Sequence, residues 1–248
     1  MSRTKDLQLM VVGLVLLLVL LEVVGRLRLL GDSWPPLSEV VGYLGDPTAR
    51  ALLGRALEAT VSSALLGFVL GSVVGIGAAV VTLLVTFLRP GLERLAGVAN
   101  AIPPLALGTL MVSTVGGDGA PTALAALGSG FTMFVAGTSG LEAAASSHHD
   151  VFRVLGASRW TRLLRLQLPA AVPLLLDGAA LAGSGSVMGA IFGEWFGAHR
   201  GIGVLLISAM QNVQIELLWA AALSAALVSL VVFLVISGVR TVAVRRFA

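Results

Sequence analysis

The chain is dominated by long apolar runs that hold almost no charged residues. Each run is about 18 residues or longer, which is the length that an α-helix needs to cross the hydrocarbon core of a bilayer. That core offers no water to the backbone amides, so they must be satisfied within a helix or a closed barrel. Runs of this length favour helices. We expect six spans, at about residues 7–24, 56–88, 95–115, 122–140, 170–192 and 217–237.

The composition agrees with a membrane protein. Of the 248 residues, 57% are apolar and only 12% are charged, whereas soluble domains are roughly 45–50% apolar and about 25% charged. We therefore predict an all-α integral membrane protein in which residues 1–248 form a single transmembrane domain. The formal net charge of +3 is too small to indicate a nucleic-acid partner. The chain has no cysteine, so it holds no disulfide and no Cys-ligated metal.

The distribution of basic residues predicts how the chain is oriented. Cytoplasmic segments of membrane proteins carry an excess of Lys and Arg. With the N-terminus inside, the expected inner segments contain Arg3, Lys5, Arg89, Arg94, Arg153, Arg159, Arg162, Arg165, Arg240, Arg245 and Arg246. The expected outer segments contain only Arg26, Arg28, Arg50, Arg55 and Arg200. We therefore expect both termini and the loop at 141–168 to face the cytoplasm.

Several kinds of catalytic and metal chemistry are excluded by what the chain lacks. Its only lysine is Lys5, so it has neither a P-loop nor an internal lysine for a Schiff base. His148 and His149 are adjacent in the expected cytoplasmic loop, while His199 lies across the membrane from them, so we do not expect a three-ligand zinc site. We expect no enzyme activity, no bound metal and no cofactor in the chain itself.

The loop between the fourth and fifth expected spans carries a distinctive pattern. From Asp150, the stretch DVFRVLGASRWTRLLRLQLP predicts a short helix, a turn at Gly156 and a second helix. Gly156 suits the left-handed residue that ends a helix, and Ser158 suits the N-cap of the next one. Val151 and Phe152 make the first helix unusually apolar for a cytoplasmic loop. Such a helix beside a glycine turn indicates a surface that docks into a groove of another protein.

This loop resembles the cytoplasmic loop of ABC-importer permeases. The signature of that loop is E-A-A, three residues, Gly, nine residues and then I-x-L-P. Gly156 takes the glycine place, and the closing residues run from 166 to Pro169. The E-A-A place then falls on residues 150–152, where Val and Phe depart from the two alanines. The literal Glu-Ala-Ala at 142–144 lies eight residues upstream and is a coincidence of an alanine-rich stretch.

The resemblance extends over most of the chain. The stretches SWPPLSEVVGYL, AIPPLALGTLMV and GEWFGAHRGIGVLL are similar to segments of permeases for sulfonates, taurine, nitrate and thiamine precursors. It implies a multi-pass subunit of the bacterial inner (plasma) membrane, surrounded by lipid. It also implies a second permease copy forming a homodimer, separate ATPase subunits that use ATP, and a periplasmic or lipid-anchored solute-binding protein.

The resemblance also implies site residues. The ATPase contact would comprise Asp150, Val151, Phe152, Arg153, Leu155, Gly156, Ala157, Ser158, Arg159 and Pro169. For the solute pathway we name Asp177 and Glu194, because acidic side chains near the membrane are costly and usually functional. Glycines at 67, 71 and 75 indicate close helix packing rather than solute contact.

Two alternatives differ from this interpretation. One is a secondary transporter, a class that commonly shows inverted repeats and an ion site at the midplane, neither of which is found in the sequence. The other is an intramembrane enzyme or a structural membrane partner. Co-purification of a separate ATPase distinguishes them from a permease.

Overall fold

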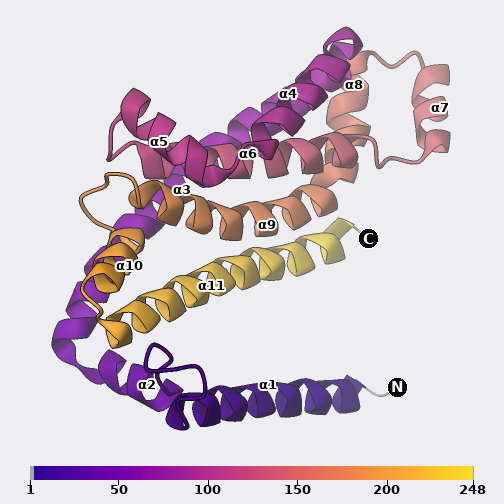
Figure 1. Ribbon diagram of the computed structural model, residues 1–248. Coiled ribbons are helices and arrows are strands. Elements are labelled where there is room, and N and C mark those ends of the chain that lie inside the picture. Colours follow the sequence, from indigo (N-terminus) through magenta and orange to yellow (C-terminus); the bar gives the residue numbers. More distant parts are fainter. Residues whose placement is uncertain (1–2, 248) are drawn as a thin grey trace.

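The computed structural model describes residues 3–247, and its regular structure over that range is helical (Figure 1). The α-helices are α1 (Arg3–Arg26), α2 (Leu37–Gly45), α3 (Pro47–Leu84), α4 (Arg89–Ala101), α5 (Pro104–Val115), α6 (Ala120–Leu141), α7 (Ser146–Val154), α8 (Arg159–Arg162), α9 (Leu168–Glu194), α10 (Ile202–Gln211) and α11 (Ile215–Phe247). A 3-10 turn, η1 (Thr86–Leu88), precedes α4, and a π-helical turn, η2 (Leu163–Gln167), joins α8 to α9. The prediction of an all-α protein is confirmed.

Five stretches of the described residues are long and apolar enough to cross a membrane. The helix pair α4–α5 makes a sixth if it is counted as one bent span. The direction of the helix axis bends by 98° between its two parts. The break lies where Pro103 follows Ile102, because proline donates no amide hydrogen and disfavours helical geometry in the residue before it.

Some helix bounds differ from the expected spans. Helix α3 begins at Pro47 rather than near Ala56, because the Asp46 side chain caps it by accepting a hydrogen bond from the Ala49 amide at 3.1 Å. The expected loop at 141–168 contains the two short helices that the sequence predicts, α7 and α8. Helical geometry resumes at Arg159 and continues to Glu194 as one stretch, because η2 keeps the backbone bonded between α8 and α9.

The centre of the bundle consists of α3, α6 and α9, which lie side by side in Figure 1. Gly67, Gly71 and Gly75 form one stripe of α3, and a Cβ atom on any of them would collide with the backbone or side chains of α6. Ser129 of α6 donates a hydrogen bond to the Gly67 carbonyl at 3.2 Å across this contact. The glycine stripe therefore allows α3 and α6 to pack backbone against backbone.

Helix α1 is joined to the bundle near its C-terminal end. The Glu22 carboxylate accepts hydrogen bonds from the Ser38 amide at 3.0 Å and from the Ser38 hydroxyl at 2.7 Å, which fixes α1 to α2. Trp34 stacks edge-on against Trp219 with ring centroids 4.6 Å apart, which fixes the α1–α2 segment to α11. Most other described side chains of α1 are exposed apolar residues, and lipid suits that surface.

The long helices give the molecule two ends. In Figure 1, α7, the N-terminal end of α1 and the C-terminal end of α11 lie at one end of the molecule. Helices α2 and α10 and the turns that connect α5 to α6 and α9 to α10 lie at the other. The two candidate sites are at these opposite ends.

Candidate functional site

Helix α7 stands away from the bundle in Figure 1 and exposes apolar side chains. Val151 is 55% exposed, Leu155 is 75% exposed and Val154 is 87% exposed. Val154 is absent from the predicted contact set, although it belongs to the same apolar stretch, VFRVL at 151–155, as three apolar members of that set. An apolar surface on a projecting helix of nine residues is typical of a site that another protein covers.

The turn after α7 closes the helix in the way the sequence predicts. Gly156 has a φ of +68°, so it is left-handed. Its amide donates to the Arg153 carbonyl at 3.0 Å, and the Ala157 amide donates to the Phe152 carbonyl at 2.9 Å. These two bonds together form a Schellman cap. A Cβ atom at Gly156 would meet nothing within 4 Å, so the turn is open to a partner.

The second half of the loop is tied to the bundle. The Ser158 hydroxyl accepts a hydrogen bond from the Thr161 amide at 3.1 Å, so the predicted N-cap is present. Arg159 donates from Nη1 to the Leu84 carbonyl at 3.1 Å, at the C-terminal end of α3. That carbonyl belongs to the last turn of a helix, where cations are favoured. This hydrogen bond joins the start of α8 to the end of α3.

The literal Glu-Ala-Ala lies apart from α7. Glu142 follows the last residue of α6, and its carboxylate pairs with the Arg89 guanidinium at the start of α4. Arg89 also donates from Nε to Glu93 Oε1 at 2.7 Å. Glu142 thus joins α6 to α4 within the bundle. Sequence spacing did not reveal this role, because the two partners are 53 positions apart.

The structure brings most of the predicted contact residues together. Residues 150–159 occupy α7, the Gly156 turn and the start of α8, and an Asp150–Arg153 pair at 3.3 Å lies on the exposed side. Pro169 lies apart from them, in the first turn of α9. The predicted contact residues therefore gather on α7 and its turn, and Pro169 is the member that lies elsewhere.

Asp177 and Glu194 have partners within the chain. Asp177 Oδ1 lies 2.5 Å from Arg240 Nε, an ion pair that joins α9 to α11 without an aligned hydrogen bond. Glu194 is 2% exposed, and its Oε2 accepts a hydrogen bond from the Gly203 amide at 2.7 Å. Glu194 thereby caps the N-terminus of α10. Neither side chain lines the two larger cavities of the described residues.

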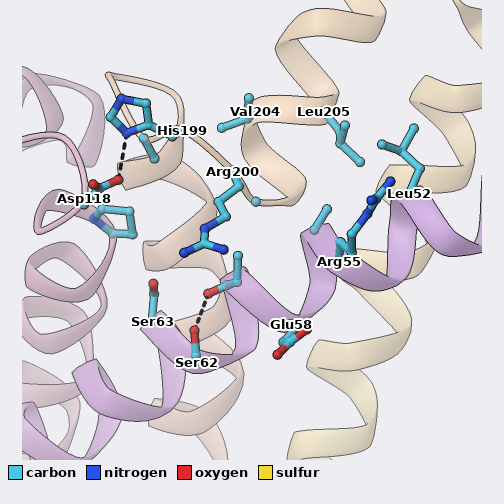
Figure 2. Close-up of a pocket in the computed structure, with 15 residues that line it drawn as sticks. Leu52, Arg55, Glu58, Ser62, Ser63, Asp118, His199, Arg200, Val204 and Leu205 are labelled. Atoms are coloured by element: carbon cyan, nitrogen blue, oxygen red, sulfur yellow. Dashed lines mark hydrogen bonds and ion pairs between the residues drawn. The ribbon is translucent and has the colours of Figure 1, made fainter.

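A cavity of about 760 Å³ (Figure 2) lies among elements that Figure 1 places at the end opposite α7. It is bounded by the first half of α3, the turn between α5 and α6, and the connection from α9 to α10. His199 Nδ1 and Asp118 Oδ1, 3.0 Å apart, form a pair on its rim. The hydrogen bond with His199 holds the pKa of the Asp118 carboxyl below its ordinary value. Sequence reasoning missed this cavity, because its walls come from three distant segments.

A smaller cavity, of about 210 Å³, lies at the break between α4 and α5, against α6 and α9. Its lining is almost entirely apolar, with Asn100 as the polar exception. Among residues 3–247, no three His, Asp or Glu side chains are arranged to hold a metal ion.

Comparison with known proteins agrees with these features. Residues 67–248 match the family described as the binding-protein-dependent transport system inner membrane component. A probable ABC transporter permease protein of Haemophilus influenzae is 29% identical over 187 residues, which cover 75% of this chain and 76% of the relative. A putative aliphatic sulfonates transport permease protein of Bacillus subtilis is 28% identical over 73% of this chain and 62% of its own length.

Another relative is the formylaminopyrimidine transport permease protein of Halalkalibacterium halodurans, 29% identical over 62% of each chain. Among solved structures, an inward-facing form of the MetNI methionine ABC transporter has a chain with a TM-score of 0.72. It shares 16% identity, and the match covers 80% of this chain and 99% of that one, so it shows the same fold. The chain belongs to the binding-protein-dependent transport system inner membrane component family, and it is a multi-pass permease subunit of an ABC importer rather than an enzyme.

Proposed function

We propose that this chain forms the solute pathway and receives the energy of ATP hydrolysis from a separate ATPase through α7 and the turn at Gly156. The observation that carries the proposal is the exposed apolar surface of α7. Beside it lies a hydrogen-bonded turn with free space around Gly156. Asp150, Val151, Phe152 and Leu155 would contact the ATPase together with Val154. The residues 156–159 would carry its motion to α3 and α9.

The same proposal sets the orientation of the chain. With α7 in the cytoplasm, the described ends of α1 and α11 also lie on the cytoplasmic side, which agrees with the excess of basic residues there. The cavity near His199 then opens outward, where a solute-binding protein would deliver the solute. We propose that residues 1–248 act as one transmembrane domain that pairs with a second copy in the surrounding lipid.

The names of the relatives bear on the solute. One is described as transporting aliphatic sulfonates and another formylaminopyrimidine. We propose a small organic solute of similar size. Asp177 and Glu194 are not proposed as solute contacts, because their ion pair and hydrogen bond give both of them a role in joining helices.

The test is co-purification of the chain with its ATPase, followed by ATP-dependent uptake into vesicles. Val154→Asp places a charge in the proposed apolar contact and is expected to abolish co-purification and uptake. Ser147→Asp adds the same charge to α7 at an exposed polar position and is the matched control. If the two variants behave alike, α7 is not the ATPase contact.

The isolated chain is expected to hydrolyse no ATP, and hydrolysis that survives removal of contaminants would contradict the proposal.

A further inference from the structure

The cavity near His199 contains arginines that have no carboxylate partner. Arg55 and Arg200 both line it. Neither forms an ion pair with any acidic side chain of residues 3–247. An arginine on the wall of a cavity with its guanidinium uncompensated is an electrostatic site for an anion.

Arg200 is directed across the cavity rather than out of it. Figure 2 shows its guanidinium extended from the connection between α9 and α10 toward Ser62 and Ser63 of α3. The Ser62 hydroxyl donates to the Ala59 carbonyl at 2.8 Å. The Ser63 hydroxyl has no hydrogen-bond partner in the described part of the chain, so it is available to a ligand. Arg55 extends toward Leu52, at the other side of the cavity.

Two acidic side chains, Glu58 and Asp118, line the cavity together with the two arginines. Asp118 is paired with His199 at 3.0 Å. The Glu58 carboxylate is directed away from Arg200 in Figure 2. Glu194 lies behind the wall and accepts from the first turn of α10, where a helix N-terminus favours negative charge. Asp118 keeps its negative charge, and the charge of Arg200 contributes to holding the pKa of that carboxyl down. The proposal for an anion therefore rests on the direction of the Arg200 guanidinium, which is paired with no carboxylate of the described residues, rather than on a net positive charge of the cavity.

The segment that carries Arg200 is held rigidly. Gly201 follows it with a φ of +139°, and the Glu194 carboxylate fills the space where a Cβ atom would be. Thr60 of α3, 1% exposed, accepts a hydrogen bond from the Ile202 amide at 2.8 Å. Two buried polar side chains from different helices thus hold the amides of two consecutive residues, Ile202 and Gly203. They anchor the backbone beside Arg200, which sets where its side chain enters the cavity.

We propose that this cavity binds the oxyanion group of a small anionic molecule, a sulfonate, carboxylate or phosphate, between the Arg200 guanidinium and the Ser63 hydroxyl. A guanidinium offers two parallel N–H donors to such a group, and the cavity volume of about 760 Å³ lies within the range of small-molecule sites. The binding claim stands on these residues alone. Only the claim that the bound anion is then transported rests on the proposed function.

The test measures binding without transport. The full-length chain is placed in phosphatidylcholine nanodiscs. The midpoint temperature of its unfolding is measured at increasing concentrations of methanesulfonate or inorganic phosphate, at constant ionic strength. The rise in midpoint gives an apparent dissociation constant. Arg200→Gln is expected to weaken binding of the probe at least about tenfold. Ser63→Ala is expected to weaken it roughly threefold to tenfold. Arg50→Gln, which removes an outer arginine of α3 that does not line the cavity, is expected to leave binding unchanged.

A second arm separates a free anion from a lipid headgroup. One outcome is that phosphatidylglycerol raises the midpoint of the wild-type chain but not of Arg200→Gln, while the free probes have no effect. In that case the bound oxyanion comes from a lipid headgroup, and the proposed site is supported. If the probes and the anionic lipid act equally on wild type and Arg200→Gln, or act on neither, the site is refuted. Absence of ATP-dependent uptake by the wild-type complex would instead count against the proposed function, and it leaves this binding result unaffected.

Discussion

Gly156 is the single residue on which the proposed coupling contact depends most. Its φ of +68° is unfavourable for any side chain with a Cβ atom, at a cost of about 1–3 kcal/mol. Gly156→Arg would add that strain and would place a long side chain in the open space beside α7. We expect loss of transport with weakened or uncoupled ATP hydrolysis, while the chain still inserts and folds. Uptake into vesicles and co-purification with the ATPase measure both effects.

The control for this prediction is Glu142→Ala. That change removes the pair with Arg89, whose side chains are 40% and 48% exposed. Ion pairs this exposed contribute only about 0–1 kcal/mol. We therefore expect coupling to be nearly intact. Normal transport by Gly156→Arg together with failure of Glu142→Ala would mean that the upstream Glu-Ala-Ala is the contact.

Glu194 supports a second prediction at the residue scale. Glu194→Ala would leave the Gly203 amide without its 2.7 Å partner in a buried position, which costs about 1–3 kcal/mol. Glu194→Gln keeps an acceptor oxygen of the same reach. We expect the alanine variant to lower the thermal midpoint in detergent and the glutamine variant to restore most of it. Equal loss in both would indicate that charge, rather than the hydrogen bond, is what the site requires.

At the scale of elements, the contact between α3 and α6 can be tested with two glycines of one helix. A side chain at Gly71 would collide with the Ala126 carbonyl and Ser129, whereas a side chain at Gly77 would meet nothing within 4 Å. Overpacking a tight contact costs about 1–3 kcal/mol, and more where backbone must move. We expect Gly71→Leu to reduce thermal stability or folded yield and Gly77→Leu to be tolerated. Comparable stability of the two variants would refute backbone contact along this stripe.

The elements also show what sequence reasoning can reach. The left-handed turn at Gly156 and the cap at Ser158 were predicted, because each depends on residues within a few positions of it. The Asp46 cap that starts α3 early was missed, since the apolar run begins later than the helix. The pairs Arg89–Glu142 and Asp177–Arg240 were also missed, because they depend on how helices pack. The cavity near His199 was missed for the same reason, because three distant segments form its walls.

At the scale of the whole molecule, the two ends of the bundle should lie on opposite sides of the membrane. The chain has no cysteine, so single cysteines report their own position. Gly45→Cys, beside the start of α3, is expected to react with a membrane-impermeant thiol reagent on intact cells. Ser147→Cys, in α7, is expected to react only after the cells are opened. The reverse pattern would overturn the orientation. Residue 248, which we expect in the cytoplasm, lies outside the described residues.

The helical stretch Arg159–Glu194 connects the α7 loop to the cap of α10. A π-helical turn, η2, and Pro173 both lie in the half nearest α8, so a bend of this stretch is expected there rather than in the other half. The remainder, residues 174–194, is a stiff rod about 30 Å long. If the rod pivots by about 10° at Pro173, Glu194 moves on the order of 5 Å, given the rise per residue of a helix. Such a movement would carry the Gly203 amide and, because Thr60 of α3 holds the Ile202 amide, α3 would have to move with the segment that presents Arg200. A small displacement at the α7 end would then become a larger displacement of Arg200, with no hinge needed near the cavity that contains it.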